Sequence, residues 1–331
     1  NFVGYDLEES GGNAVQEAGM LLAYGIELVR SCVEAGVDAE AALSRFGFQI
    51  AQGNDFFEEI VKIRALRRIW ATTMKERFGV NDPRAMHVRI HTHTSGAMLT
   101  AEQPLVNLVR TTLHAFGAAL SGVQAMEVAA YDEALAIPTE ASATLTLRIQ
   151  QVIQEETNIT AVSDPLAGSY FVENLTEQMA KAALALVEQI EDMGGYIAAQ
   201  RQGWIRTEIE ENAERWRDVT AGRRGVVGVN RYKTESAEEP ELFTVDEEVE
   251  RVAIERVKAL RAGRDGPRYD AAMTAFADAV GEFASAAMGS INPDKLMSTA
   301  IAAAQADATT GEMMAVMKAK LGWDAPYNYG P

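Results

Sequence analysis

Cysteine is almost absent from this sequence, because Cys32 is the only one among 331 residues. A single thiol cannot form an intrachain disulfide, which excludes a disulfide-stapled secreted scaffold and favours a reducing, cytoplasmic compartment. Long apolar runs are also missing, and a membrane-spanning helix would need about 18 to 20 consecutive apolar residues. The first residues contain neither a basic segment nor an apolar one, so we expect no signal peptide.

Positive charge is scarce as well. The chain has 30 Lys and Arg residues against 48 Asp and Glu residues, a net charge of −18. This balance excludes general affinity for nucleic acid or for an anionic membrane, since both require clustered cations. An anionic small ligand would need arginines placed locally around it. The hydrophobic share of 47% is sufficient for one large core or two smaller ones.

Three of the four histidines lie in one short segment, residues 86–96. Polar and apolar side chains alternate there with the period of two that is typical of a β-strand. His87, Arg89, His91 and His93 share one predicted face, and Val88, Ile90 and Thr92 share the other. Parallel strands usually bury apolar side chains on both faces, so this row predicts a polar interior that holds a polar ligand. Alternatively, these side chains form a structural network of hydrogen bonds without a ligand, or they lie on an edge strand with one face exposed to solvent.

Four strands, each followed by an amphipathic helix, are predicted over the first 160 residues. The strands end near residue 6 or span 46–51, 86–96 and 123–129, and the helices span 14–35, 55–78, 104–120 and 139–157. No glycine-rich phosphate loop follows any strand, which favours half of an eight-stranded barrel over an open nucleotide-binding sheet. The remainder is mainly helical, with helices predicted at 176–193, 204–217, 246–262, 269–288 and 293–321 and a short strand at 226–229.

Two features of the predicted barrel end carry chemistry. His91 and His93 point the same way at the end of a strand and suggest a metal-dependent barrel hydrolase, although further ligands would be needed. Asp132 and Glu133 directly follow the last predicted strand. They either face the barrel mouth or are acids favoured at the N-terminus of the next helix. The residues alone do not decide whether His91 and His93 bind a metal, or which of the two roles Asp132 and Glu133 have.

Seven motifs resemble, in order, the large subunit of adenosylcobalamin-dependent acyl-CoA mutases, the family of methylmalonyl-, isobutyryl- and 2-hydroxyisobutyryl-CoA mutase. They are GYDLEESG at 4–11, RIHTHTSG at 89–96, LTA at 99–101, NLVRT at 107–111, YDEALAIPT at 131–139, DPLAGSY at 164–170 and GVNRY at 228–232. Each motif is moderately specific, and their order along the chain is much more specific.

The resemblance implies an α/β fold in which residues 1–165 form the second half of a TIM-type (β/α)8 barrel and residues 166–331 form a helical post-barrel region. Coenzyme A would pass along the barrel axis, so that the acyl group meets the corrin at the C-terminal mouth. A polar interior suits this path, because pantetheine amides and hydroxyls need hydrogen-bond partners. The implied activity is that of an intramolecular transferase, which moves the thioester carbonyl group of a short branched acyl-CoA by a radical 1,2-migration.

The resemblance also assigns residues. Tyr5, Asp6 and His91 would surround the reacting acyl group; Arg45, Arg89, His93 and Gln124 would line the coenzyme A path; Glu133, beside Ala129, would hydrogen-bond the adenosyl ribose. No metal-ligating residue is assigned. Asp6 stands where the family usually has His, and Ala129 where it usually has Asn. These departures favour an altered substrate or, alternatively, a non-catalytic scaffold subunit.

The family's cobalamin-binding Asp-x-His-x-x-Gly motif is absent, since no histidine follows His114. The resemblance therefore implies that the lower ligand of cobalt comes from another domain or from a small cobalamin-binding subunit. The expected partners are an acyl-CoA substrate and that subunit, in a dimer or heterotetramer, with neither nucleic acid nor membrane. The first half of the barrel is expected to precede Asn1.

Overall fold

The computed structural model describes residues 1–211, 214–234, 240–286 and 292–322. By packing, the chain divides into two compact units, Asn1–Phe243 and Thr244–Pro331. The boundary predicted at residue 165 concerns the end of the barrel strands and their helices, and it stays a prediction. No helix in the described ranges is long and apolar enough to cross a membrane.

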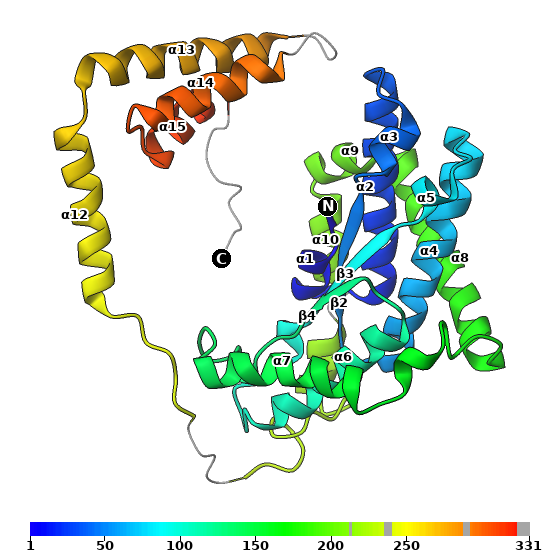
Figure 1. Cartoon of the computed structure of the whole chain (residues 1–331). Helices are drawn as coiled ribbons and strands as arrows, with labels where there is room; N and C mark the ends of the chain where they lie inside the picture. Colours follow the sequence, from blue (N-terminus) through cyan, green and yellow to red (C-terminus); the bar gives the residue numbers. More distant parts are fainter. Residues whose placement is uncertain (212–213, 235–239, 287–291, 323–331) are drawn as a thin grey trace. The chain divides into compact units, whose positions relative to one another are not determined.

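The first unit is built on a parallel sheet (Figure 1). Strands β1 (Phe2–Val3), β2 (Gly47–Gln52), β3 (Arg89–Thr94) and β4 (Ala125–Glu127) lie side by side in chain order, and every neighbouring pair is parallel. Helices α2 (Ala14–Glu34), α4 (Phe56–Phe78) and α6 (Val106–Leu120) connect them, and α7 (Glu140–Glu155) follows β4. The predicted α/β class is confirmed, and the arrangement is that of part of a TIM-type barrel.

Local sequence explains the long helices. Asn13 begins α2 with a capping box, in which its side chain accepts from the backbone N–H of Gln16 and the Gln16 side chain accepts in return. Helix α4 ends at Gly79, whose φ of 67° lies in the left-handed region that favours glycine. Its predicted apolar stripe, including Ile63 and Trp70, is buried in the main core.

Short elements fill the loops. They are α1 (Tyr5–Glu9), α3 (Ala39–Leu43), α5 (Pro83–Met86), η1 (Gly96–Met98) and η2 (Ile159–Ala161). The prediction that Tyr5 and Asp6 end a strand is wrong, because β1 stops at Val3 and both residues open helix α1. The Gly4 N–H still donates to the Gln49 carbonyl at 2.8 Å, so the chain leaves the sheet only at this point.

Four helices follow within the first unit: α8 (Tyr170–Asp192), α9 (Tyr196–Arg201), α10 (Trp204–Glu211) and α11 (Glu214–Thr220). Helix α8 packs against α2 and α4 (Figure 1). The strand predicted at 226–229 is wrong, since these residues form a turn with one isolated bridge, Val227 to Arg231. The Asn230 side chain accepts from the Val226 N–H at 2.7 Å and thereby closes the turn.

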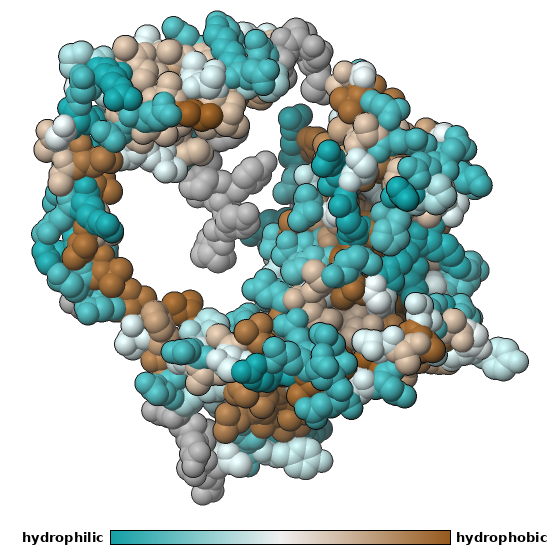
Figure 2. Space-filling model, viewed as in Figure 1, coloured by the Kyte–Doolittle hydropathy of each residue, from teal (hydrophilic) through white to brown (hydrophobic). Residues whose placement is uncertain are grey.

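The second unit contains α12 (Glu247–Gly263), α13 (Gly266–Ser285), α14 (Pro293–Gln305) and α15 (Thr310–Leu321). The single helix predicted over 293–321 is wrong: Asp307 has a φ of 61°, and Thr309 starts α15 with a capping box to Glu312. The end of the helix predicted at 288 lies outside the described residues. Helix α12 exposes several apolar side chains along one side, which Figure 2 shows in brown.

A buried ionic cluster lies where α1, α2 and α4 meet the end of β2. It consists of Lys62, Glu8, Glu17 and Glu59, whose side chains are at most 4% exposed. We call it the Lys62 cluster. Burial raises the pKa of Glu17 to about 8, with Glu8 adding to the rise and Lys62 opposing it. Burial likewise raises the pKa of Glu59 well above its usual range, with Glu8 again adding to the rise. Three carboxyls around one ammonium therefore retain a proton near neutral pH.

The cluster predicts a specific pH dependence of stability. A carboxyl whose pKa is raised on folding binds more protons in the folded chain, so its contribution falls as pH rises from the ordinary value of 4.5 toward about 8. Compared with a Glu59→Gln variant, whose side chain does not titrate, the native protein should lose free energy of unfolding as pH rises above 4.5, until the folded Glu59 carboxyl has lost its proton. Urea denaturation at several pH values measures this. A native protein that gains free energy of unfolding relative to Glu59→Gln as pH rises would contradict the raised pKa.

Candidate functional site

The register of the sheet places the predicted polar side chains on one open face. Gln49, His91 and Ala125 form one row across the strands, and Ala51, His93 and Glu127 form the next. On the opposite face, Ile50 and Thr92 are fully buried against the helices. The prediction that Arg89, His91 and His93 share a face is thus confirmed, whereas His87 precedes β3 at the end of α5.

Four of the predicted residues surround a cavity of about 210 Å³ near the start of the strands: Arg45, Arg89, His91 and Gln124. The Arg89 guanidinium donates to the Ser44 carbonyl, which holds it beside Arg45. The Gln124 side-chain oxygen accepts from the Ile90 N–H at 2.7 Å. Two guanidinium groups and one imidazole therefore face a common space.

A second cavity, of about 450 Å³, lies near the ends of the strands. His91, His93, Ala129 and Glu133 line it. Because His91 lines both cavities, they follow one another along the open face of the sheet. The side chain of Ala129 has no polar group, and its backbone N–H already donates to the Thr94 hydroxyl at 2.7 Å. Two acids line this cavity: Glu127 at the end of β4 and Glu133 in the loop that follows it.

Tyr5 is in contact with His93, which lines this second cavity; we call it the upper cavity. Their rings meet edge to face with centroids 4.6 Å apart. Burial raises the pKa of Tyr5, and the charges of Glu9 and Glu133 and a hydrogen bond to the Glu9 side chain raise it further, so its hydroxyl keeps its proton. Asp6, the next residue of α1, is exposed.

Two carboxylates flank the loop after β3. Glu133 lies against Gly96, where a Cβ atom would collide with its carboxylate, and burial followed by the charge of Glu9 raises its pKa while His93 opposes the rise. Glu9 accepts from the Ser95 hydroxyl at 2.5 Å and from the Ala97 N–H at 2.8 Å. Sequence reasoning missed Glu9, although its spacing of four from Tyr5 would have indicated a shared face once a helix was assumed.

The neighbouring acid has a different role. Asp132 is fully buried, and its carboxylate lies 3.4 Å from the Thr139 N–H and 3.5 Å from the Thr139 hydroxyl at the start of α7. Of the two acids predicted after β4, Asp132 therefore supports the next helix and Glu133 faces the cavity. No set of three His, Cys, Asp or Glu side chains within the described ranges is placed to bind a metal ion jointly. The metal-hydrolase alternative thus finds no ligand set in this part of the chain.

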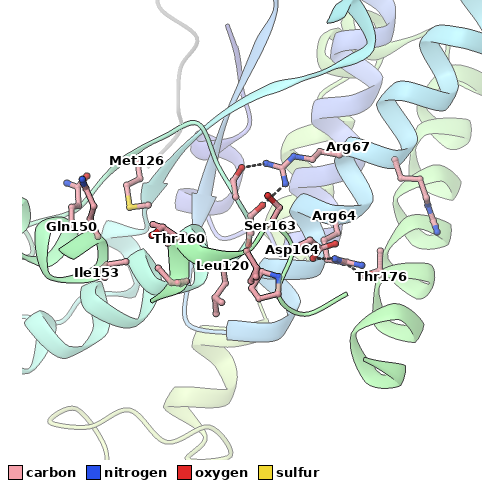
Figure 3. Close-up of a pocket in the computed structure, with 18 of the residues that line it drawn as sticks. Arg64, Arg67, Leu120, Met126, Gln150, Ile153, Thr160, Ser163, Asp164 and Thr176 are labelled. Atoms are coloured by element: carbon pink, nitrogen blue, oxygen red, sulfur yellow. Dashed lines mark hydrogen bonds and ion pairs between the residues drawn. The ribbon is translucent and has the colours of Figure 1, made fainter. Parts of the chain in front are cut away.

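A further cavity, of about 1210 Å³, lies elsewhere, between α4, α7, α8 and the loop that precedes α8 (Figure 3). Its guanidinium groups are already engaged. Arg67 donates to the carbonyls of Ser121 and Gly122, and Arg64 pairs with Asp164 and Glu173. These contacts fasten the turn before β4 and the loop before α8 to helix α4, so we assign this cavity a structural role.

Comparison with known proteins identifies the family of the chain. The model of the methylmalonyl-CoA mutase family matches residues 1–323. The chain is 37% identical over 320 residues to the 2-hydroxyisobutanoyl-CoA mutase large subunit of Aquincola tertiaricarbonis, covering 96% of this chain and 55% of that protein. It is 36% identical over 312 residues to methylmalonyl-CoA mutase of Escherichia coli (strain K12), covering 94% and 42%. It is 34% identical over 321 residues to the mitochondrial enzyme of Homo sapiens, covering 96% and 42%.

The chain therefore belongs to the methylmalonyl-CoA mutase family, as the ordered motifs predicted. It spans about half the length of the curated relatives that it matches.

Proposed function

We propose that this chain is the substrate-binding part of an adenosylcobalamin-dependent acyl-CoA mutase. The observation that carries the proposal is the pair of cavities that follow one another along the polar face of the sheet and meet at His91. A long thioester carrier with charged phosphates at one end and a small acyl group at the other fits such a path. Family membership supports the same assignment.

The ends of the path differ in charge, and this difference sets the direction of the ligand. Arg45 and Arg89 line the cavity at the start of the strands and would attract the phosphates of coenzyme A. His91, His93 and Gln124 would meet the pantetheine amides and hydroxyls. The acyl group would then reach the upper cavity beside Tyr5 and His93.

The upper cavity also fits an adenosyl ribose, because Glu133 presents a half-buried carboxylate that can accept from two hydroxyls. When bound, adenosylcobalamin supplies the radical chemistry by which the thioester carbonyl group changes carbon. This chain's residues bind and orient the substrate and keep water away from it. His114, the last histidine, is buried in α6 with its Nε2 2.5 Å from the Asn54 side-chain oxygen, so a histidine that binds cobalt would have to come from elsewhere.

The proposed substrate is a short branched acyl-CoA of the isobutyryl, 2-hydroxyisobutyryl or methylmalonyl type. The proposed partner is a small cobalamin-binding subunit or domain, in a cytoplasmic dimer or heterotetramer. The relative from Aquincola tertiaricarbonis is a large subunit, which supports a partner of this kind. The exposed carboxylate at Asp6 and the apolar Ala129 favour a second candidate, a scaffold subunit that supports a partner mutase.

One experiment separates these candidates. The full-length protein is mixed with adenosylcobalamin, the small subunit and a panel of acyl-CoAs, and the products are analysed by mass spectrometry and NMR. We expect an isomerised acyl-CoA. Bound coenzyme A without turnover would support the scaffold, and hydrolysis that a chelator abolishes would support the metal enzyme instead.

The proposed path predicts the effect of one arginine. Replacing Arg45 by Gln should raise the KM for acyl-CoA about tenfold with little change in kcat, because the lost charge-assisted bond acts equally on bound substrate and transition state. Steady-state kinetics with the full-length enzyme measure both constants. Arg84→Gln, an exposed change on α5, serves as the control. A loss confined to kcat would remove Arg45 from the binding path.

A further inference from the structure

The Lys62 cluster lies beside the site but belongs to no step described so far. Lys62 Nζ has three N–H groups, and the structure uses all three: they donate to Glu8 at 3.0 Å, to Glu17, and to the Ala51 carbonyl at 3.0 Å. Glu17 also accepts from the Ala51 N–H at 2.8 Å. Two carboxylates and one carbonyl thus satisfy the ammonium completely.

Glu59 is the member left over. Its Oε2 lies 2.6 Å from Nζ, yet it accepts no hydrogen bond of normal geometry within the described residues. An ionised Glu59 would give the buried cluster a net charge of −2 with a single cation in ion-pair range. Buried carboxylates without hydrogen bonds are costly and are normally relieved by protonation. The proton of the cluster therefore belongs on Glu59.

The nearby charges do not change this assignment. On the same helix, Glu58 is partly buried, and burial and Asp55 raise its pKa. Asp55 is in turn paired with Arg224 at 2.5 and 2.7 Å. The carboxyls of Glu58 and Asp55 add negative charge near the cluster, and negative charge also favours a protonated Glu59.

Helix α1 depends on this cluster for its position. It has only five residues, and its N-cap Gly4 makes no side-chain cap hydrogen bond, so it is too short to be stable by itself. Glu8 is its buried anchor, bound to Lys62. The same helix carries Tyr5, which contacts His93, and Glu9, which holds the loop after β3. A displacement of Glu8 would therefore move both groups at the upper cavity.

We propose that Glu59 is a positioning residue: its protonated carboxyl keeps the Lys62 cluster at a charge that α1 tolerates, and its deprotonation releases α1 together with Tyr5 and Glu9. As far as catalysis is concerned, this inference rests on the proposed mutase function. The placement of α1 does not depend on it. Activity should fall at alkaline pH through a group that never touches the substrate.

The test uses the full-length protein and hydrogen exchange at pH 6 to 9.5, corrected for the intrinsic exchange rate. The reporters are the amides of Leu7, Ser10 and Gly11, which donate within or next to α1 at 2.8, 3.0 and 2.9 Å. We expect their protection to drop by up to about tenfold for each pH unit while the folded Glu59 carboxyl still holds the proton that the opened one has lost, and to level off once the folded carboxyl has lost it too. If protection in the native protein stays constant through pH 9.5, this result is sufficient by itself to overturn the proposal.

Two variants sharpen the result. Glu59→Gln has the same shape and cannot lose a proton, so α1 should remain protected to pH 9.5, and the alkaline fall of kcat should disappear. Glu191→Gln, a change in a surface pair with Arg30 and Arg77, should behave as the native protein does. If the α1 amides of the Glu59→Gln variant lose protection at the same pH as those of the native protein, the proposed role of Glu59 is refuted. If no mutase activity is found, the exchange measurement still decides this inference.

Discussion

Replacing Lys62 by Met should lower the free energy of unfolding by about 3 to 5 kcal/mol. The side chain is fully buried and neutralises part of a group of three carboxyls, so its removal leaves buried negative charge without a cation. Methionine fills a similar volume, which separates the loss of charge from the loss of packing. Denaturant unfolding of the full-length protein at pH 7 measures the effect.

A matched surface change provides the control. Arg77→Met breaks an ion pair with Glu191 at 2.6 Å that is partly exposed, and it should cost at most about 1 kcal/mol. Adding Glu17→Gln and Glu59→Gln to Lys62→Met should recover part of the loss, because fewer buried charges then lack a partner. If Lys62→Met costs no more than the surface control, the cluster does not stabilise the fold as argued.

Replacing Glu133 by Ala should reduce adenosylcobalamin-dependent turnover roughly 10- to 150-fold while acyl-CoA binding stays nearly unchanged. A hydrogen bond to a charged group contributes about 1.5 to 3 kcal/mol, which corresponds to this range. The carboxylate lines only the upper cavity, away from the two arginines of the coenzyme A path. The activation constant for adenosylcobalamin and the KM for acyl-CoA should therefore respond differently.

The control for this change is Glu140→Ala, an exposed acid in the first turn of α7 close to Glu133 in sequence. It should leave both constants within about twofold, the usual effect of a surface substitution. Equal losses of cofactor use and acyl-CoA binding in Glu133→Ala would mean that the residue shapes the whole cavity. No loss of either would remove it from the site.

Period and spacing were sufficient to predict the open face of the sheet. A strict alternation placed Arg89, His91 and His93 together, and the register of β3 between its neighbours confirms it. The alternation of strands and helices also predicted the α/β class. These features are local, because a side chain's face in a strand depends only on its position in the pleat.

Other features depend on contacts that are distant in sequence. Nothing in α4 marks Lys62 as buried, since its partners Glu8 and Glu17 come from two earlier helices. Helix α1 was missed for the same reason, because a five-residue helix owes its existence to tertiary anchors. The break at Asp307 needs a left-handed residue inside a run of strong helix formers, which propensity alone opposes.

The central claim, that an acyl-CoA lies along the polar face of the sheet, is tested most directly by histidine footprinting of the full-length protein. Diethyl pyrocarbonate would be applied with and without saturating acyl-CoA, and each modified residue quantified by mass spectrometry. We expect the ligand to protect His91 and His93, which line the cavities, and to leave Lys181 on the outer side of α8 equally reactive. Equal labelling of both histidines with and without bound acyl-CoA would contradict it.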